Sequence, residues 1–194
     1  MRSHRTVRRS RTVKPRTNAK LALTLAGAAA LVVTSGLSTA AAAQDASSTD
    51  AAATTRTCTA SDLGISFHNR LGGGMNHAGG TLEFKNTSSS ACALRGYPGL
   101  GLENAHHDGL PARAIRGTTW YADDPGNNVV RIQPGGTAHA VVAWTHSGTA
   151  AQQAAYLRVT PPAATSYRTV ELGDAVDNGE LHVTAVATTV PVRE

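Results

Sequence analysis

The chain has 194 residues, a formal net charge of +5 and an isoelectric point of about 9.7, values that would suit a nucleic-acid-binding protein. Eight of its 18 Lys and Arg residues lie within the first twenty positions, where no acidic residue occurs. The remainder of the chain is slightly acidic and has no basic cluster interleaved with aromatic residues, so the composition excludes nucleic-acid binding.

Residues 1–43 have the three parts of a secretory signal peptide. A basic segment precedes the apolar run LALTLAGAAALVV at residues 21–33, and small residues then lead to Ala43. We therefore predict cleavage after Ala43 and export, with the mature chain outside the cell, either free or held at the cell wall.

Two alternatives remain for this N-terminus. Residues 21–43 are long enough for an uncleaved membrane anchor, although they are rich in Ala, Thr, Ser and Gly and only weakly apolar. Arg8 and Arg9 precede the apolar run as in twin-arginine export, but the hydrophobic residues that usually follow such a pair are missing. The ordinary secretory route is favoured, and the mature domain is not expected to span the membrane.

Residues 44–57, QDASSTDAAATTRT, are small and polar without an apolar period, which predicts a disordered spacer. Residues 58–194 are long enough for one domain with an adequate core. The two cysteines, Cys58 and Cys92, both lie in that part. In an exported chain an even number of cysteines favours a disulfide, which would add about 3–4 kcal/mol in the chain-entropy model. Two buried free thiols are the alternative.

From Cys58 onward the apolar residues recur at every second position, the period of half-buried β-strands. Ile65 and Phe67 share one face, which Leu71 is expected to join, and Trp144 has the parity of a core residue. Residues 149–155 are the one segment where a helical turn is expected. The other predicted strands lie near residues 81–86, 99–104, 110–115, 128–136, 137–146, 156–162, 167–172 and 180–187. Eight or nine short strands separated by turn residues predict an antiparallel β-sandwich.

The block FKNTSSSACALRGYPGLGL, residues 84–102, combines a polar bend, a cysteine and the turn Gly96-Tyr97-Pro98-Gly99. The two glycines suit special backbone angles or a close approach, and the Tyr97 hydroxyl is expected to cap the corner. We interpret the block as framework of the fold. The alternative is that Tyr97 is a ring on which a ligand stacks.

This block, the opening CTASDL at residues 58–63 and the strand entry QPGGTA at residues 133–138 resemble a large actinobacterial family of exported proteins. That family is known only as domain of unknown function four-two-three-two. The resemblance spans about residues 58–187 and implies an immunoglobulin-like sandwich, export and no established activity. Relatives usually carry a second cysteine pair, which this chain lacks, and this leaves Cys58 to bond Cys92.

Outward-facing histidines are the candidates for metal binding. His68, His139 and His182 have outward parity on predicted strands, and two of them could approach if the first and last strands were neighbours. No cysteine or carboxylate lies at ligand spacing, and the acidic turns lack the spacing of a calcium loop. We predict neither a metal nor a cofactor, and a surface-histidine carrier of metal or small ligands is the second-ranked function.

Catalytic motifs are also missing from the sequence. It has no Gly-x-Ser-x-Gly elbow, no serine near an identifiable His-Asp pair, and no carboxylate pair in an implied cleft. We expect no catalytic residues and no enzyme. A hydrolase is therefore only the third-ranked function.

Trp120 and Tyr121, in the irregular segment RGTTWYADDPGNN at residues 116–128, are the most conspicuous aromatic pair. Exposed rings beside Asp and Asn can stack on sugars or anchor a protein contact, so the pair is the candidate binding surface. The alternative is that Trp120 folds back over the edge of the sandwich. The favoured function is an exported non-enzymatic module that binds a cell-envelope polysaccharide or a protein partner.

Overall fold

The computed structural model describes residues 55–74 and 76–193, and these form an all-β domain. The predicted signal peptide and residues 44–54 of the predicted spacer lie outside the described residues. Within the described part no helix is long and apolar enough to cross a membrane.

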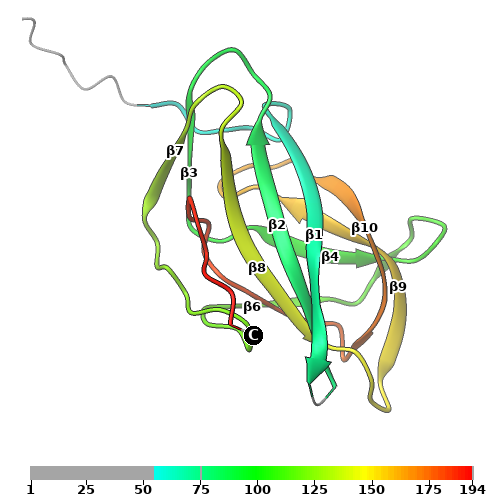
Figure 1. The fold of residues 1–194 in the computed structure, drawn as a ribbon. Coiled ribbons are helices and arrows are strands. Elements are labelled where there is room, and N and C mark those ends of the chain that lie inside the picture. The colour runs from blue at the N-terminus through cyan, green and yellow to red at the C-terminus, as the bar shows by residue number, and fades with distance from the viewer. Residues whose placement is uncertain (1–54, 75, 194) are drawn as a thin grey trace, which may run out of the picture. The chain divides into compact units, whose positions relative to one another are not determined.

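The domain is a β-sandwich of two larger sheets, flanked by a two-stranded sheet (Figure 1). The five-stranded sheet has the spatial order β1 (Leu63–Gly74), β2 (His77–Asn86), β8 (Thr137–Thr145), β11 (Glu180–Val183) and β6 (Arg113–Arg116). The four-stranded sheet has the order β10 (Arg168–Asp177), β9 (Ala151–Thr160), β4 (Gly99–Glu103) and β5 (Gly109–Leu110). The small sheet pairs β3 (Cys92–Arg95) with β7 (Val129–Ile132). Neighbouring strands are antiparallel except for β11 and β6, which are parallel.

The predicted β-sandwich is confirmed, but the expected number of strands and the expected helical turn are wrong. The structure has eleven strands, because β3 is a separate strand and because Pro111, which has no backbone N–H to donate, separates β5 from β6. Residues 149–155 contain no helical turn. Ala151 begins β9, and Ala151–Gln153 pair with β10, so tertiary pairing overrides the local helix propensity of alanine.

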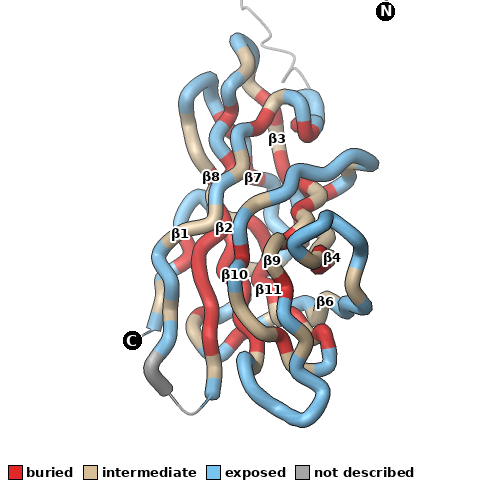
Figure 2. Tube along the Cα trace, turned by 90° about the vertical axis from the view of Figure 1, so that its right-hand side faces the viewer, coloured by how far each residue is buried: buried red, intermediate tan, exposed pale blue. Residues whose placement is uncertain are grey.

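The core lies between the two larger sheets and is built by the alternation seen in the sequence. On β2 the side chains of Leu82 and Phe84 are buried, and on β8 those of Ala140, Val142 and Trp144 are buried in the same cluster. Figure 2 shows that buried positions run along the strands while most loops are exposed. Each fully buried Leu or Phe side chain stabilises the fold by about 1.5–3 kcal/mol.

Leu71 lies on the opposite face from the one predicted. The pairing of β1 with β2 shifts between His68 and Leu71, where Asn69 has a φ of 49°. Two residues of β1, Asn69 and Arg70, therefore oppose the single residue Gly80 of β2, which defines a β-bulge. Because the bulge inverts the alternation, Leu71 packs in a second apolar cluster outside the sandwich.

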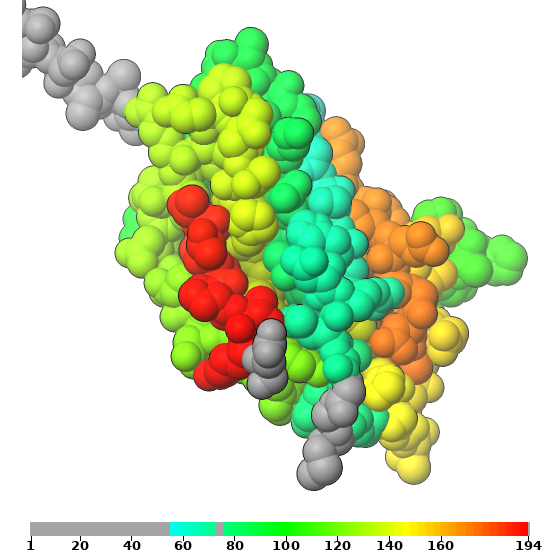
Figure 3. Space-filling model, in the orientation of Figure 1, coloured from blue at the N-terminus to red at the C-terminus, as the bar shows by residue number. Residues whose placement is uncertain are grey.

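That second cluster covers the outer face of the five-stranded sheet. Val141 of β8 is fully buried there, together with Ala122 of the irregular loop and Val190 of the C-terminal segment. The backbone N–H of Arg193 donates to the carbonyl of Tyr121 at 2.6 Å, so the loop and the C-terminal segment are tied together. Figure 3 shows the C-terminal residues, in red, lying against the face that contains β8.

Two adjacent glycines allow aromatic rings to pack against both faces of β2. A Cβ atom on Gly79 would lie 2.8 Å from the ring of Tyr121 on the outer face and 2.7 Å from the carbonyl oxygen of Val142. A Cβ atom on Gly80 would lie 2.5 Å from the ring of Phe67 on the inner face. The Gly-Gly pair is therefore required because aromatic rings pack directly on the strand backbone from both sides.

The predicted disulfide between Cys58 and Cys92 is present, and both cysteines are buried. The N–H of Cys58 donates to the carbonyl of Ala93, and the N–H of Ala93 donates to the carbonyl of Arg56. Residues 55–57, which the sequence analysis assigned to the spacer, are thus part of the folded domain, where Thr57 forms a bridge with Ala93.

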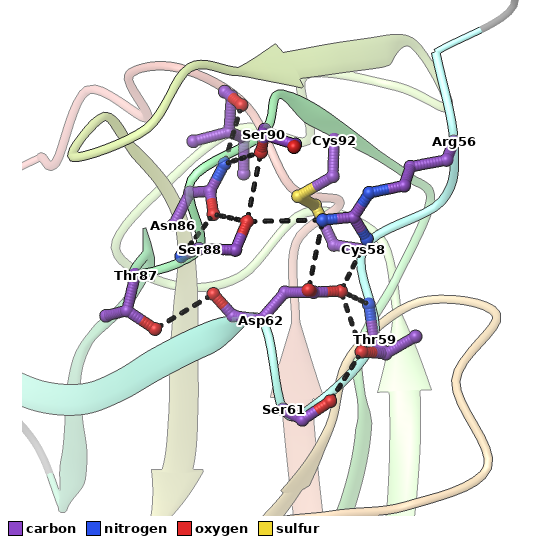
Figure 4. The surroundings of a disulfide bond; sticks show 11 residues. Arg56, Cys58, Thr59, Ser61, Asp62, Asn86, Thr87, Ser88, Ser90 and Cys92 are labelled. Carbon is purple, nitrogen blue, oxygen red and sulfur yellow. Dashed lines mark hydrogen bonds and ion pairs between the residues drawn. A yellow bond between two sulfur atoms is a disulfide. The ribbon is translucent and has the colours of Figure 1, made fainter. Parts of the chain in front are cut away.

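A hydrogen-bond network surrounds this disulfide (Figure 4). The guanidinium of Arg56 donates to both carboxylate oxygens of Asp62, at 2.7 and 3.0 Å, and Asp62 also accepts from the N–H and hydroxyl of Thr59. The buried side-chain amide of Asn86 donates to the carbonyls of Ser90 and Ile132. Arg56 also donates to the Ser88 hydroxyl at 3.1 Å, and the Thr87 hydroxyl donates to the carbonyl of Asp62 at 3.0 Å, so the chain before β1 is joined to the bend before β3 and this region serves as framework.

Candidate functional site

The Gly96–Gly99 turn lies at a corner where three segments meet. Gly96 has a φ of 94°, a backbone conformation that favours glycine. The Tyr97 hydroxyl donates to Asp124, whose other carboxylate oxygen accepts the N–H of Ala185 at 2.8 Å. The hydrogen bond to Asp124 raises the pKa of Tyr97 above its ordinary value. In this arrangement Tyr97 connects segments of the fold through its hydroxyl.

The three histidines considered as metal ligands lie on separate strands. β1, which carries His68, is separated from β11, which carries His182, by both β2 and β8. His139 on β8 contacts Glu83 at 3.5 Å and the carbonyl of Thr188 at 2.9 Å. Among the described residues no three His, Cys, Asp or Glu side chains gather where they could hold a metal ion.

Glu103 belongs to a polar cluster on the outer face of the four-stranded sheet. Its buried carboxylate lies 2.9 Å from Nδ1 of His107 and 3.5 Å from Nε of Arg158. The His107 ring also stacks on Tyr156 with a centroid separation of 4.2 Å. These contacts fold the β4–β5 hairpin tip onto the sheet, and the charged groups of the cluster pair mainly with one another.

Trp120 lies over the outer face of the five-stranded sheet, between two histidines that the sequence analysis did not connect with it. Its ring stacks on that of His77 with a centroid separation of 4.0 Å, and it is tilted against that of His182 at 4.5 Å. These histidines belong to β2 and β11, the strands on either side of β8. The residue remains 41% exposed. Burial lowers the pKa of His182 below its ordinary value.

Tyr121, in contrast, packs against the second apolar cluster. Its hydroxyl donates to the carbonyl of His77 at 2.9 Å, and its ring lies against Gly79. Burial raises the pKa of Tyr121. The structure therefore divides the predicted aromatic pair into an exposed ring, Trp120, and a packed ring, Tyr121.

Two hollows adjoin this aromatic surface and share Arg70, Leu71 and Gly72. The larger has a volume of about 450 Å³ and the smaller about 260 Å³. The larger is completed by His77, Ala78, Gly79, His146, Gly173 and Asp174, and the smaller by Tyr121 and Arg193. We call the two hollows together the Arg70 groove.

Two of the three strands that border the larger hollow, β1 and β10, contain a bulge at this point. The first is the β1 bulge at Asn69 and Arg70 described above. The second lies in β10, where the pairing with β9 shifts between Glu171 and Asp174 and Gly173 has a φ of 60°. Bulges redirect side chains and are common beside functional sites. Here they bring Arg70 of one sheet and Asp174 of the other to the same hollow.

The guanidinium of Arg70 lies over two aromatic rings. Its central carbon is 5.2 Å from the ring centroid of Phe67 and 5.8 Å from that of Trp144, within cation–π range. Unlike Arg56, Arg113, Arg158 and Arg193, it forms no ion pair with any residue that the structure describes. Arg70 is thus positioned by packing while its hydrogen-bond donors remain available.

Asp174, the carboxylate of the groove, already has several partners. One oxygen accepts the indole N–H of Trp144 at 3.2 Å, and the other accepts the N–H of Ala175 at 2.8 Å and lies 3.9 Å from Nδ1 of His146. It is the only carboxylate among the residues that line the two hollows. The arrangement offers a cationic donor, a few polar side chains and a nearby indole, which suit binding.

The groove was not predicted from the sequence, and no local signal marked it. Phe67 and Leu71 are four positions apart, which fits the period of two, so the bulge at Asn69 and Arg70 is visible only in the strand pairing. No local signal connects those residues with Asp174 or His146, because they are brought together only by the packing of the two sheets.

Comparison with known proteins gives one match. The family model described as Domain of unknown function (DUF4232) matches residues 58–187. The search of curated proteins and the search of solved structures found no match.

Proposed function

We propose that this chain, which belongs to the domain-of-unknown-function family DUF4232, is an exported, non-enzymatic β-sandwich module that binds a cell-envelope polymer. The observation that carries the proposal is the Arg70 groove beside the exposed ring of Trp120. A pre-positioned arginine and an exposed indole are the residue types that dominate recognition surfaces.

Export is supported by the disulfide and by the basic, apolar and small-residue segments of residues 1–43. A non-enzymatic role is supported by the chemistry of the groove. Its carboxylate, Asp174, is engaged by the indole N–H of Trp144 and by a backbone N–H, which suits a binding surface.

A sedimentation experiment tests the proposal. The full-length chain is produced in a host that exports it, and the protein recovered from the medium should begin near Gln44. The protein is mixed with insoluble envelope material that is either untreated or has been stripped of its proteins by protease, with the protease then removed. It should sediment with both preparations. Loss of sedimentation after protease would identify a protein partner instead, and an intact chain beginning at Met1 in the cell fraction would indicate an anchor.

Variants locate the binding surface in the same assay. Trp120→Ala should reduce co-sedimentation several-fold, since it removes the exposed ring beside the groove. Val129→Ala is the matched control, because Val129 is a 64% exposed apolar residue on β7 and does not line the groove. Failure of the wild-type protein to sediment with any envelope fraction would contradict the proposed function.

A further inference from the structure

Arg70 is held so that its charged fork is available at the protein surface. The Phe67 and Trp144 rings support the guanidinium, and an arginine fixed in this way loses little side-chain freedom when it binds. The planar fork matches the two oxygens of a carboxylate or phosphate. The chemistry of the residue therefore specifies an oxyanion.

The surroundings of Arg70 add donors and leave space. Nδ1 of His77 is buried and has no hydrogen-bond partner among the described residues. His146 also lines the larger hollow, and Arg193 lines the smaller one. A Cβ atom on Gly72 would meet nothing within 4 Å, so the shared wall of the groove is open.

The carboxylate of the groove is held by groups other than Arg70. Asp174 accepts from the indole N–H of Trp144 and from a backbone N–H and lies 3.9 Å from His146, and Asp123 is paired with Arg193 at 2.7 Å. Arg70 forms no ion pair with a carboxylate that the structure describes. An anion that enters the groove thus meets a donor without displacing an existing ion pair.

We infer that the Arg70 groove recognises the oxyanion of an acidic polymer of sugar or polyol units, with Arg70 as the binding residue. This inference rests on the proposed function and names the chemical class of the polymer. The two hollows, of about 450 and 260 Å³, share Arg70, Leu71 and Gly72, so a polymer bound at Arg70 can contact both, and the exposed Trp120 ring stacks on His77, which lines the larger hollow. The polar groups of His146 and Asp174 and the Gly72 backbone suit hydroxyl groups between successive anions.

The test is a titration of the exported protein with soluble polymers. Binding is monitored by NMR through the backbone amide and arginine Nε–H signals. The probes are polygalacturonate for carboxylates, poly(glycerol phosphate) for phosphodiesters and dextran as the neutral polymer. Signals of Arg70, Leu71, Gly72 and His77 should shift with at least one polyanion and not with dextran. The polyanion that binds more tightly identifies the source of the oxyanion.

Variants separate recognition from packing and from general electrostatics. Arg70→Met keeps the apolar stem over the rings and should weaken binding at least tenfold, whereas Arg70→Lys keeps the charge but not the fork and should be intermediate. The matched control is Arg131→Met, at an exposed position of β7 away from the groove, and it should bind within twofold of wild type. Thermal melts of each variant establish that it is folded.

Three results would overturn the inference. One is equal binding of dextran and the polyanions, a second is equal loss in Arg131→Met and Arg70→Met, and the third is no shift at residues 70–77 with any polyanion. If the protein still sediments with envelope material in these cases, the proposed function stands and only the oxyanion assignment is wrong. If it does not sediment, both are wrong.

Discussion

Asp62 shows how a single polar residue stabilises the beginning of the domain. Its carboxylate accepts hydrogen bonds from Arg56 and from the hydroxyl and N–H of Thr59, and its own carbonyl accepts from Thr87. The hydrogen bonds from Arg56 and Thr59 hold the pKa of Asp62 far below its ordinary value. The ionised carboxylate is therefore the form that stabilises the fold.

Replacing Asp62 should make this contribution measurable as a function of pH. Asp62→Asn is expected to lower the free energy of unfolding by about 1–2 kcal/mol at pH 7, because hydrogen bonds to a charged group are lost. Since the folded-state pKa is depressed, the contribution is present above the unfolded pKa of about 4 and is lost as the pH falls below it. Urea denaturation at several pH values should show the two proteins converging under acidic conditions.

The control for this experiment is Glu171→Gln, on an exposed position of β10. Its free energy of unfolding should lie within about 0.5 kcal/mol of wild type at every pH. A difference between Asp62→Asn and wild type that stays constant down to pH 2 would contradict the assigned role of the carboxylate.

At the level of elements, β2 is the strand against which side chains pack on both the inner and the outer face. The Phe67 ring packs against its inner face at Gly80, and the Tyr121 ring packs against its outer face at Gly79. The neighbouring strand β1 bulges beside these glycines, which turns Leu71 outward and places Arg70 in the groove. The Gly79-Gly80 pair of β2 and the adjacent bulge of β1 therefore together determine the close packing on β2 and the position of Arg70 in the groove.

A pair of glycine substitutions tests this arrangement. Gly79→Ala should destabilise the domain by about 1–3 kcal/mol, because its Cβ would lie 2.7 Å from the carbonyl oxygen of Val142 and 2.8 Å from the Tyr121 ring. Gly72→Ala is the matched control in β1, where a Cβ would have no neighbour within 4 Å. Thermal and urea unfolding should show that Gly72→Ala is neutral or slightly stabilising; equal effects of the two changes would contradict the packing argument.

For the molecule as a whole, the disulfide joins the chain before β1 to β3 of the small sheet. Cys92 is fully buried in the main core cluster, and Cys58 lies beside the Arg56–Asp62 network. The N-terminal segment, the small sheet and the sandwich are therefore stabilised together by one covalent link and its surrounding hydrogen bonds.

Removal of the disulfide should destabilise the whole domain. Cys92→Ser is expected to lose about 2–5 kcal/mol of the free energy of unfolding, as for native disulfides of small exported domains. Peptide mapping of exported wild-type protein without reductant should find a single Cys58–Cys92 bridge. Two free thiols in that protein would contradict the framework assignment and require Cys92 to be considered as a reactive residue.

The features predictable from the sequence are those that depend on local periodicity or on residue counts. The alternation around Leu82, Phe84 and Trp144 specifies strands with one buried face, because successive side chains of a strand point to opposite sides. Two cysteines leave one possible pairing, and the block at residues 84–102 indicated the family that the comparison confirms.

The tertiary structure alone decided where the candidate site lies. Arg70 and Asp174 are more than a hundred positions apart in the chain and meet because a bulge in each sheet directs both toward one hollow. His77 and His182 contact Trp120 because β2 and β11 happen to flank β8. Strand order and register depend on pairings between distant segments, and local periodicity carries no information about which strands become neighbours.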